Sequence, residues 1–237
     1  MYNRIISFSY DDKIFSDAQN GFRKGKSIDT AVHSFIERIQ EATDKRVHTF
    51  GIFLDLTKAY DVMNHKLLPE TQFHYGIRGS TDLWFRSYLS HRKQFIEICQ
   101  SDSSRVRVNR YRSSSMEIKQ GVPQGSVLGP LFLLYINDRL VNIHHAHLIM
   151  SAGDINVLIS DSDERSLQIT IDRVFAKLET WFHRNDLVIN ARETGVMSFH
   201  NRQTHFPVKP LVTFNKMTVD YTKEMKFIGI QIMDTLK

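Results

Sequence analysis

The sequence has almost no cysteine, the residue whose disulfides stabilise many proteins outside a reducing compartment. Its 237 residues include one cysteine, Cys99, which excludes an internal disulfide framework. A buried, unreactive thiol is the ordinary interpretation of such a residue. The chain also lacks an apolar stretch as long as a signal peptide or membrane span requires, and its N-terminal MYNRIISFSYDDKIF carries charges throughout. We therefore expect an intracellular protein, nuclear or cytoplasmic, that is not secreted and has no membrane partner.

Repeats, low-complexity tracts and obvious linkers are missing as well. The chain does have 41% hydrophobic and 11% aromatic residues, enough to bury a substantial core in one unit with two lobes. Its 31 Lys and Arg against 26 Asp and Glu give a formal net charge of +5. That balance suits a polyanionic partner but is a weak signal by itself.

The clearest helix is predicted over about residues 163–183. Its apolar residues recur at alternating steps of four and three, so they form one stripe that a sheet or helix must cover. They are Leu167, Ile171, Val174, Leu178 and Trp181. Other helices are predicted at IDTAVHSFIERIQEATDKR, with Ser27 or Asp29 as its cap, at STDLWFRSYLSHR, and at VLGPLFLLYINDRLV with Pro130 in its first turn. Pro69, within HKLLPETQFHYGI, predicts a kink or break.

Strands are predicted where short apolar runs rich in β-formers occur. HTFGIFLDLTKAYD indicates a buried strand, and HLIM, SAGD and INVLI together indicate a β-hairpin. Residues 101–115 are polar and basic, which indicates an exposed loop or hairpin, and further short strands are predicted at LVIN, GVMSF and MKFIGIQI. Strands mixed with segregated helices favour an α+β fold over a doubly wound sheet.

Two carboxylates stand out as candidates for metal chemistry. An ionised Asp55 within GIFLDL is costly to bury unless it is paired or bound to a metal, although it could instead point into solvent or cap the following turn. Asp154 lies at the tip of the predicted hairpin, where it can project toward a strand end such as Asp55, although an Asp in a Gly-Asp turn is usually a turn residue. Two such carboxylates make a Mg²⁺ site for nucleotidyl transfer feasible. Asp61, beyond the strand, is expected to cap the next helix.

Two loops are candidates for ligand contact. QGVPQGSVLGP, from Gln120 to Pro130, has a composition that permits close backbone approach to a ligand, although it could be a plain loop with Ser126 as a helix cap. Arg23, Lys24 and Lys26 could grip a triphosphate, although a solvated basic loop is more common.

Taken in order along the chain, these segments resemble one known family. NGFRKGKS, FLDLTKAYD, QGVPQGSVLGP, YIND, the hairpin with Asp154, LVINARET and KFIGI together resemble the reverse transcriptase domain of non-LTR retrotransposons over nearly the whole chain. The combination of GVPQGSVLGP with FLDLTKAYD is highly specific. The resemblance implies the fingers and palm of a right-hand polymerase, with a mainly antiparallel palm sheet backed by helices.

The resemblance also implies an activity and its partners. The reaction would be RNA-templated DNA synthesis, with an RNA template, a DNA primer, deoxynucleotide triphosphates, and Mg²⁺ or alternatively Mn²⁺. Asp55 and Asp154 would be the catalytic, metal-binding carboxylates, and Tyr60 the aromatic gate near the sugar. Gln124 and Gly125 would line the nucleotide path, and MKFIGI resembles the primer grip. Arg23, Lys24 and Lys26 lie in the segment that resembles a triphosphate-contacting loop.

Three departures from the family pattern predict an impaired copy. The family hairpin reads aromatic-Ala-Asp-Asp, but here Ser151 and Ala152 are followed by Gly153 and Asp154, so one carboxylate is missing. By analogy with removal of one transition-state stabiliser, the expected loss of rate is at least ~10²–10³. Glu193 stands where the family usually has Lys, and a negative charge there repels a triphosphate. The helix in GPLFLLYIND is one residue shorter than in the family, which rotates the residues after the gap by about 100°.

The resemblance further predicts how the chain is divided. Residues 1–48 would form the fingers side and 49–200 the palm, with a fingers insertion near 70–118. Residues 201–237 would form the primer-grip region, which leaves no room for a full thumb. Three functional interpretations remain: a weakened RNA-directed DNA polymerase, a catalytically dead remnant that still binds RNA or DNA with a steep dependence on salt, and a relic that folds poorly.

Overall fold

The protein combines helices with antiparallel sheets. The computed structural model describes residues 2–11, 14–56, 58–101, 108–122, 129–137, 146–151, 153–190, 193–200, 209–214 and 217–235. Its helices are α1 (Tyr2–Asp11), α2 (Ile28–Asp44), α3 (Ala59–Val62), α4 (Leu67–His74), α5 (Ser80–Leu89), α6 (Gly129–Ile136) and α7 (Glu164–Arg184). Its strands are β1 (His48–Asp55), β2 (Lys93–Gln94), β3 (Glu97–Ser101), β4 (Val108–Arg112), β5 (Met116–Glu117), β6 (Ala146–Ser151), β7 (Asp154–Asp161), β8 (Gly195–Phe199), β9 (Thr213–Phe214), β10 (Met217–Thr218), β11 (Glu224–Phe227) and β12 (Ile230–Met233). The predicted α+β class is confirmed.

The central element is a four-stranded sheet in the order β6-β7-β1-β8. All three pairings in it are antiparallel, and β1 lies between β7 and β8. The β6–β7 hairpin brings Ser151 opposite Asp154, and the β1–β7 register then brings Asp154 opposite Asp55. The register therefore places two carboxylates at the same end of neighbouring strands.

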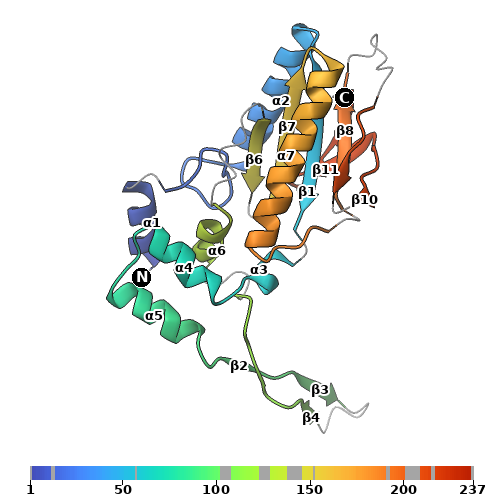
Figure 1. The fold of residues 1–237 in the computed structure, drawn as a ribbon. Helices are drawn as coiled ribbons and strands as arrows, with labels where there is room; N and C mark the ends of the chain where they lie inside the picture. The colour runs from blue at the N-terminus through green and yellow to red at the C-terminus, as the bar shows by residue number, and fades with distance from the viewer. Residues whose placement is uncertain are drawn as a thin grey trace.

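Both faces of this sheet are covered, because alternate strand residues point into two different cores. Under α7, Phe50, Ile52 and Leu54 of β1 pack with Leu167, Ile171, Val174 and Leu178 of the helix. Under α2 and the β11–β12 hairpin, Phe53 packs with Phe35, Ile39, Phe199 and Phe227. In Figure 1, α7 runs across the front of the sheet, with α2 beyond it. A sheet covered in this way holds its strand ends rigidly.

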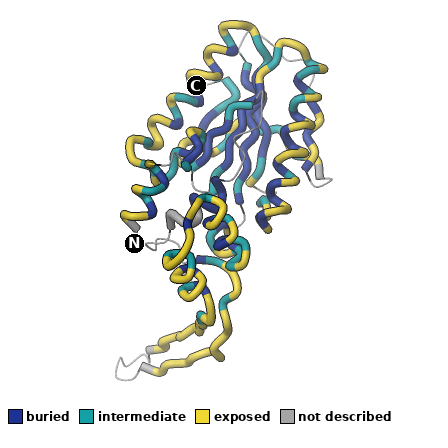
Figure 2. Tube along the Cα trace, turned by 60° about the vertical axis from the view of Figure 1, so that its left-hand side comes forward, coloured by how far each residue is buried: buried dark blue, intermediate teal, exposed yellow. Residues whose placement is uncertain are grey.

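A second group of helices lies beyond one end of the sheet. Figure 1 draws α1, α4, α5 and α6 close together there, and a two-stranded ribbon of β2–β5 and β3–β4 leads away from α5. Figure 2 shows that this ribbon is exposed along its described length, in contrast with the buried strands of the sheet. The ribbon confirms the exposed hairpin predicted around residues 101–115, although residues 102–107 lie outside the described part.

The predicted helices occur with small shifts of their ends. The helix expected over 163–183 is α7, whose N-cap Asp163 accepts a hydrogen bond from the Ser166 backbone N–H at 2.8 Å. All five residues of its predicted stripe are buried. Ser27, rather than Asp29, caps α2, in a capping box with Thr30. The helix predicted at STDLWFRSYLSHR is confirmed as α5. Of the helix predicted at VLGPLFLLYINDRLV, the described part forms α6 with Pro130 in its first turn, and residues 127, 128 and 138–141 lie outside the described residues.

Two predictions about helix ends are wrong. Pro69 does not break a helix, because α4 begins at Leu67 and runs through Pro69 to His74, and a first-turn residue needs no intrahelical acceptor for its nitrogen. Asp61 does not cap the next helix, because it lies inside α3. The N-cap position of α4 is occupied by Lys66, which makes no side-chain cap bond.

Among the strands, β1, the β6–β7 hairpin and β8 are as predicted. MKFIGIQI is not one strand, because it turns at Gly229 (φ 86°) and forms the β11–β12 hairpin. LVIN makes only an isolated bridge between Ile189 and Leu56. The expectation that Cys99 is buried is wrong, since it is exposed on the ribbon strand β3. Among the described helices, none has both the length and the apolar character that a membrane crossing needs.

Candidate active site

The predicted convergence of Asp55 and Asp154 is present in the structure. Asp55 ends β1 and Asp154 begins β7, and the two are direct cross-strand partners. Both side chains are partly exposed, so the carboxylates lie at the sheet end rather than in either core. The hydrophobic packing of the residues behind them fixes this end of the sheet.

The two carboxylates interact electrostatically. Burial raises the pKa of the Asp154 carboxyl, and the nearby charge of Asp55 raises it further. Lys226, from β11, acts in the opposite direction and lowers that pKa. The site therefore concentrates negative charge that a cation can stabilise, with one lysine as its described counter-charge.

A polar residue after α7 supports Asp55. The Asn190 backbone N–H donates to the Asp55 carbonyl oxygen at 2.8 Å, and its side-chain Nδ2 donates to Asp55 Oδ2 at 3.4 Å. The turn that begins at Asn190 carries Glu193, whose backbone N–H donates to the Asn190 carbonyl oxygen at 3.1 Å. The Glu193 side chain is exposed. The residue predicted to repel a triphosphate therefore lies in the turn that holds Asp55.

Gly153 precedes Asp154 in the hairpin turn and has room for a side chain. A Cβ atom built on Gly153 would meet the Ala59 Cβ at 3.4 Å, an ordinary van der Waals contact, and its φ angle is not in the left-handed region. Ala59 begins α3, the short helix that also carries Tyr60. The position that lacks the family's carboxylate is thus adjacent to the helix of the predicted aromatic gate.

Tyr60 is half-buried, and burial raises the pKa of its hydroxyl. Its carbonyl oxygen accepts a hydrogen bond from the Val122 backbone N–H at 2.8 Å, and the Gly121 N–H donates to the Met63 carbonyl at 2.7 Å. The start of QGVPQGSVLGP is therefore fixed to the segment that follows β1. Gln124 and Gly125, predicted to line the nucleotide path, lie outside the described residues.

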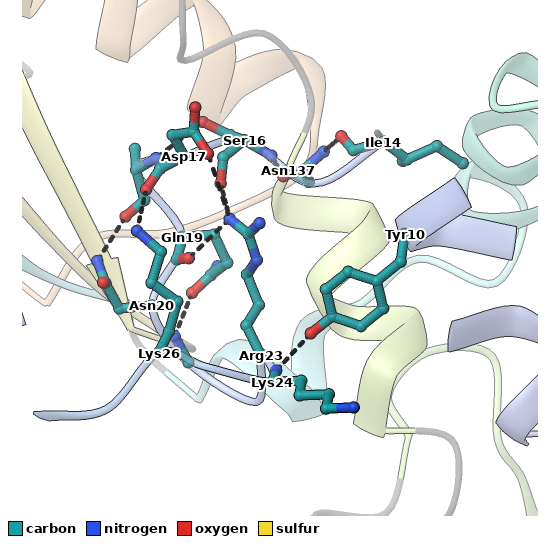
Figure 3. Close-up of polar contacts among 12 residues, drawn as sticks. Tyr10, Ile14, Ser16, Asp17, Gln19, Asn20, Arg23, Lys24, Lys26 and Asn137 are labelled. Atoms are coloured by element: carbon teal, nitrogen blue, oxygen red, sulfur yellow. Dashed lines mark hydrogen bonds and ion pairs between the residues drawn. The ribbon is translucent and has the colours of Figure 1, made fainter. Parts of the chain in front are cut away.

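Arg23 of the basic loop is used within the loop itself (Figure 3). Its guanidinium donates to the carbonyl oxygens of Ser16 at 2.6 Å and Gln19 at 3.2 Å, and lies 4.0 Å from the Asp17 carboxylate. The Arg23 side chain is 13% exposed, and it lies over the Phe15 ring. Arg23 therefore stabilises residues 16–19, which adjoin the sheet through the Met150–Ala18 and Asn20–Met150 backbone hydrogen bonds.

The two lysines of this loop have more freedom. Lys24 is exposed, and its backbone N–H donates to the Tyr10 hydroxyl. The Lys26 ammonium makes one long contact, at 3.5 Å, with the Asp17 carbonyl oxygen. Of the three basic residues, the lysines are the ones with charge available for an anionic ligand.

Two residues outside the predicted site set support it. Asn190 follows a short apolar run and Lys226 lies within MKFIGI, and both motifs contributed to the family resemblance without being assigned a contact with the carboxylates. Their positions beside Asp55 and Asp154 follow from a bridge and a separate hairpin that the local pattern did not predict. Asn137 of YIND has a structural role: it is buried, accepts from the Ser16 N–H at 2.8 Å and donates to the Ile14 carbonyl at 2.6 Å.

The donor set at the sheet end fits a hard divalent cation. Carboxylate oxygens are the ligands that Mg²⁺ prefers, and a cation would relieve the repulsion between Asp55 and Asp154. Two protein carboxylates are available for it. Nowhere in the described part of the chain do three or more His, Cys, Asp or Glu side chains form a group that could hold a metal.

Comparison with known proteins gives a consistent result. The family described as "Reverse transcriptase (RNA-dependent DNA polymerase)" matches residues 1–232. The "Probable RNA-directed DNA polymerase from transposon BS" of Drosophila melanogaster is 28% identical over 97% of this chain and 25% of its own length. The "RNA-directed DNA polymerase from mobile element jockey" of the same organism is 24% identical over 97% of this chain and 24% of its own length. The chain spans about a quarter of the length of these relatives.

Solved structures share the fold at low sequence identity. Apo telomerase from Candida tropicalis, truncated from the C-terminal domain, matches all of this chain and 44% of its own length, with a TM-score of 0.56 and 12% identity. Telomerase from the same organism in complex with a TWJ fragment of telomeric RNA matches with a TM-score of 0.54 over 36% of its length, again at 12% identity. At this identity the likeness concerns the fold. The family match over nearly the whole chain, together with the carboxylate pair at the sheet end, identifies this chain as a member of the reverse transcriptase (RNA-dependent DNA polymerase) family.

Proposed function

We propose that this chain is the fingers-and-palm part of a retrotransposon polymerase that copies RNA into DNA. The observation that carries the proposal is the cross-strand pairing of Asp55 with Asp154 at the exposed end of a rigid sheet. In the reaction, the primer 3′-hydroxyl oxygen forms a bond to the α-phosphorus of a deoxynucleotide. The bond from that phosphorus to the β-phosphate oxygen breaks, the hydroxyl proton is lost, and pyrophosphate leaves.

The cofactor that fits this site is Mg²⁺, with Mn²⁺ as an alternative, held by Asp55 and Asp154. When bound, such a cation neutralises charge on the phosphate oxygens and lowers the pKa of the attacking hydroxyl. Asn190 orients the Asp55 carboxylate through its side-chain contact at 3.4 Å. Lys226 favours ionised Asp154, the form that binds a cation.

The substrates would contact residues around this pair. Tyr60, on the helix that follows β1, stacks near the sugar, and Gln124 and Gly125 line the nucleotide and template path. Lys24 and Lys26 contact the triphosphate, while Arg23 shapes their loop through its carbonyl contacts. The RNA-bound telomerase of the same fold supports RNA as the template to test. The division at residues 48, 200 and 237, and the intracellular location, remain parts of this proposal.

We further propose that this copy is slow. Gly153 removes a ligand beside Asp154, and Glu193 adds negative charge to the turn that begins at Asn190. Loss of one transition-state stabiliser of this kind costs at least ~10²–10³ in rate. The second candidate function, a catalytically dead remnant that binds RNA or DNA, is favoured by the same observation, since only two carboxylates remain at the sheet end.

Primer extension on an RNA template with Mg²⁺ or Mn²⁺ tests both candidates. We expect Gly153→Asp to extend primers at least ~10²-fold faster than the unchanged chain, because the missing ligand is restored where a side chain has room. Gly153→Asn is the matched control, since it adds nearly the same volume without the charge. Asp55→Ala should abolish extension in either background.

Each other outcome decides between the candidates. Rapid extension by the unchanged chain that depends on Asp55 would show that Asp154 suffices and that the site is not damaged. Equal acceleration by Gly153→Asp and Gly153→Asn would show that volume, not a metal ligand, limits the rate. If no variant extends a primer while all of them bind the template, the polymerase proposal fails and the binding remnant is the better description.

A further inference from the structure

Arginines lie over exposed or partly buried aromatic rings on the segment from α4 to the ribbon. The Arg78 guanidinium is 4.7 Å from the centre of the Phe73 ring, and Arg92 is 4.5 Å from that of Tyr88. On the ribbon, Arg112 is 4.3 Å from the centre of the Phe95 ring. Such pairs place a planar cation on a ring face, a favourable arrangement at about 0.5–1 kcal/mol even when exposed.

Further aromatic surface continues these pairs. Trp84 stacks on Tyr88 within α5, with ring centroids 5.3 Å apart and planes 12° apart, so Tyr88 contacts both Trp84 and Arg92, which follows the helix. On the ribbon, Tyr111 and its cross-strand partner Ile98 are 58% and 62% exposed. Together these residues form what we call the arm surface: Phe73, Arg78, Trp84, Tyr88, Arg92, Phe95, Ile98, Tyr111 and Arg112.

Burial within this chain does not explain the ribbon part of the arm surface, which is Phe95, Ile98, Tyr111 and Arg112. Figures 1 and 2 show the ribbon extending away from the sheet and the helices, and in Figure 2 both described strands are yellow, the colour of exposed residues. When neither face of a two-stranded ribbon is covered, an aromatic side chain on it buries little apolar area and so contributes little to the free energy of folding. A partner must therefore account for these residues if they have a function.

The charge of the segment identifies the chemistry of that partner. Residues 91–119 contain seven Lys or Arg against three Asp or Glu, a net charge of +4. The whole chain has a net charge of +5, so nearly all of its excess positive charge belongs to this segment. A polyanion is the complementary partner, and the rings specify one that has planar faces to stack.

We propose that the arm surface binds single-stranded nucleic acid, with bases stacked on its rings and guanidinium planes and phosphates on the basic groups of the same segment. Proteins that bind single strands without sequence preference combine a basic surface with stacking aromatics in this way. The inference deepens the proposed function, because the RNA template is a single strand before it is copied. The arm surface would hold that strand apart from the carboxylate pair.

Fluorescence anisotropy with labelled oligonucleotides of about 16 nucleotides, a length that fits such sites, tests this inference on the full chain. Single-stranded RNA and DNA should both bind, since stacking and phosphate contacts need no 2′-hydroxyl, and a duplex should bind more weakly. The double variant Phe95→Ser with Tyr111→Ser should weaken binding about 25-fold or more, because loss of each stacking ring weakens it by roughly fivefold or more. Thermal unfolding should be unchanged, since both rings are exposed.

Ile169→Ser is the matched control, because Ile169 is 48% exposed on α7 and lies outside the arm surface. It should leave affinity within about twofold, as expected for a residue that makes no contact. For charge, Arg92→Ala should reduce the salt dependence of binding by about one ion, whereas Arg173→Ala on α7 should not. Equal losses in arm and control variants, or no loss in the double variant, would overturn the inference.

Two other results would also overturn it. One is the absence of single-strand binding by the unchanged chain. The other is a double variant that changes the sedimentation coefficient and not the affinity, since the arm surface would then contact a second copy of the chain. Failure of the proposed function looks different: binding would depend on the arm surface while no variant, Gly153→Asp included, extends a primer. Extension with binding that is independent of the arm surface would reject this inference alone.

Discussion

The central sheet and the ribbon are both antiparallel, yet apolar side chains are buried in the sheet and exposed on the ribbon. In the sheet, Phe50 and Ile52 of β1 are at most 1% exposed, whereas Ile98 and Tyr111 of the ribbon are more than half exposed. The difference lies in what covers each structure. The sheet has α7 on one face and α2 with the β11–β12 hairpin on the other, whereas no described helix packs on the ribbon (Figure 1).

The comparison indicates different roles for the two structures: the sheet positions the carboxylate pair, and the ribbon offers a binding surface. A sheet buried on both faces can hold like charges side by side at its end, because its strands are fixed by packing that does not involve those charges. A ribbon without cover leaves both of its faces available to a partner. Substitutions in the sheet should therefore act mainly on stability and the carboxylate pair, and substitutions in the ribbon mainly on binding.

The largest expected effect is on the sheet core. Phe35→Ala should lower the free energy of unfolding by about 3–5 kcal/mol, because Phe35 is fully buried and stacks on Phe227 with ring centroids 4.2 Å apart. Ile98→Ala is the ribbon counterpart and should change it by less than about 0.5 kcal/mol. Urea unfolding followed by circular dichroism measures both. A large loss with Ile98→Ala would mean that the ribbon is packed in solution, which would break the comparison.

The next effect is at the junction where the chain returns from the ribbon to α3. Gly121 has φ 84°, and a Cβ atom there would lie 2.7 Å from the Asp61 carbonyl oxygen, so Gly121→Ala must displace α3. Gly229→Ala is a close match, since its φ is 86° and its Cβ would meet nothing within 4 Å. It should lower the free energy of unfolding by about 1–2 kcal/mol, because alanine is less stable than glycine in the left-handed conformation.

Gly121→Ala should lower the free energy of unfolding more than Gly229→Ala does, by the energy needed to move α3. When it is added to Gly153→Asp, it should also slow primer extension. Unfolding measurements give the first quantity and primer extension the second. Equal stability losses would show that α3 yields easily and that the start of QGVPQGSVLGP does not fix Tyr60.

Much of the sheet and its covering helix could be predicted from local sequence, because burial against a core requires apolar residues in a recognisable pattern. The stripe on α7 follows from a helix with one face on a core, and the continuous apolar run of β1 from a strand buried on both faces. Asp55 and Asp154 could be expected to meet because each adjoins a strand end. MKFIGIQI departs from the single predicted strand because its turn at Gly229 has apolar neighbours, so the apolar run hides a hairpin. The pattern in LVIN is that of a strand, but only Ile189 pairs with Leu56.

The ribbon was harder to predict in detail, since no core imposes a pattern on it. Isolated cysteines are usually buried, but the strand that carries Cys99 has nothing to be buried against. The parts of the site that local pattern missed, Asn190 and Lys226, reach the carboxylates from segments that are distant in sequence. Arg23 could be found as a basic residue, but its contacts with Ser16 and Gln19 required the folded loop.

A smaller effect tests the charge repulsion at the sheet end. Because burial and Asp55 raise the pKa of Asp154, its protonated form is favoured by folding. Its contribution to stability is therefore fully present below the ordinary pKa of an aspartate and is lost as the pH rises through the raised value. Asp154→Asn, which stays neutral, should raise Tm at neutral pH and lose this advantage in acid.

Each kcal/mol gained would appear as about 2–4 °C in Tm for a chain of this length. Asp172→Asn, which alters an exposed carboxylate on α7, is the control and should show no such pH-dependent gain. Thermal unfolding across a pH series measures the difference. A lower Tm for Asp154→Asn at neutral pH would mean that ionised Asp154 is stabilised by Lys226 more than it is repelled by Asp55.

The last prediction concerns the ribbon, where stability should fall only slightly. It sharpens the comparison because affinity for nucleic acid should rise in the same variant. Glu97 lies 2.8 Å from Arg112 and 4.0 Å from Arg110 in ion pairs at the surface. Glu97→Gln should therefore change the free energy of unfolding by no more than about 0.5–1 kcal/mol. Both guanidinium groups would then be released for phosphates, so affinity for single-stranded RNA should rise, with a steeper dependence on salt. If affinity falls instead, Glu97 holds Arg112 in the stacked position over Phe95, and the order of the ribbon matters more than its charge.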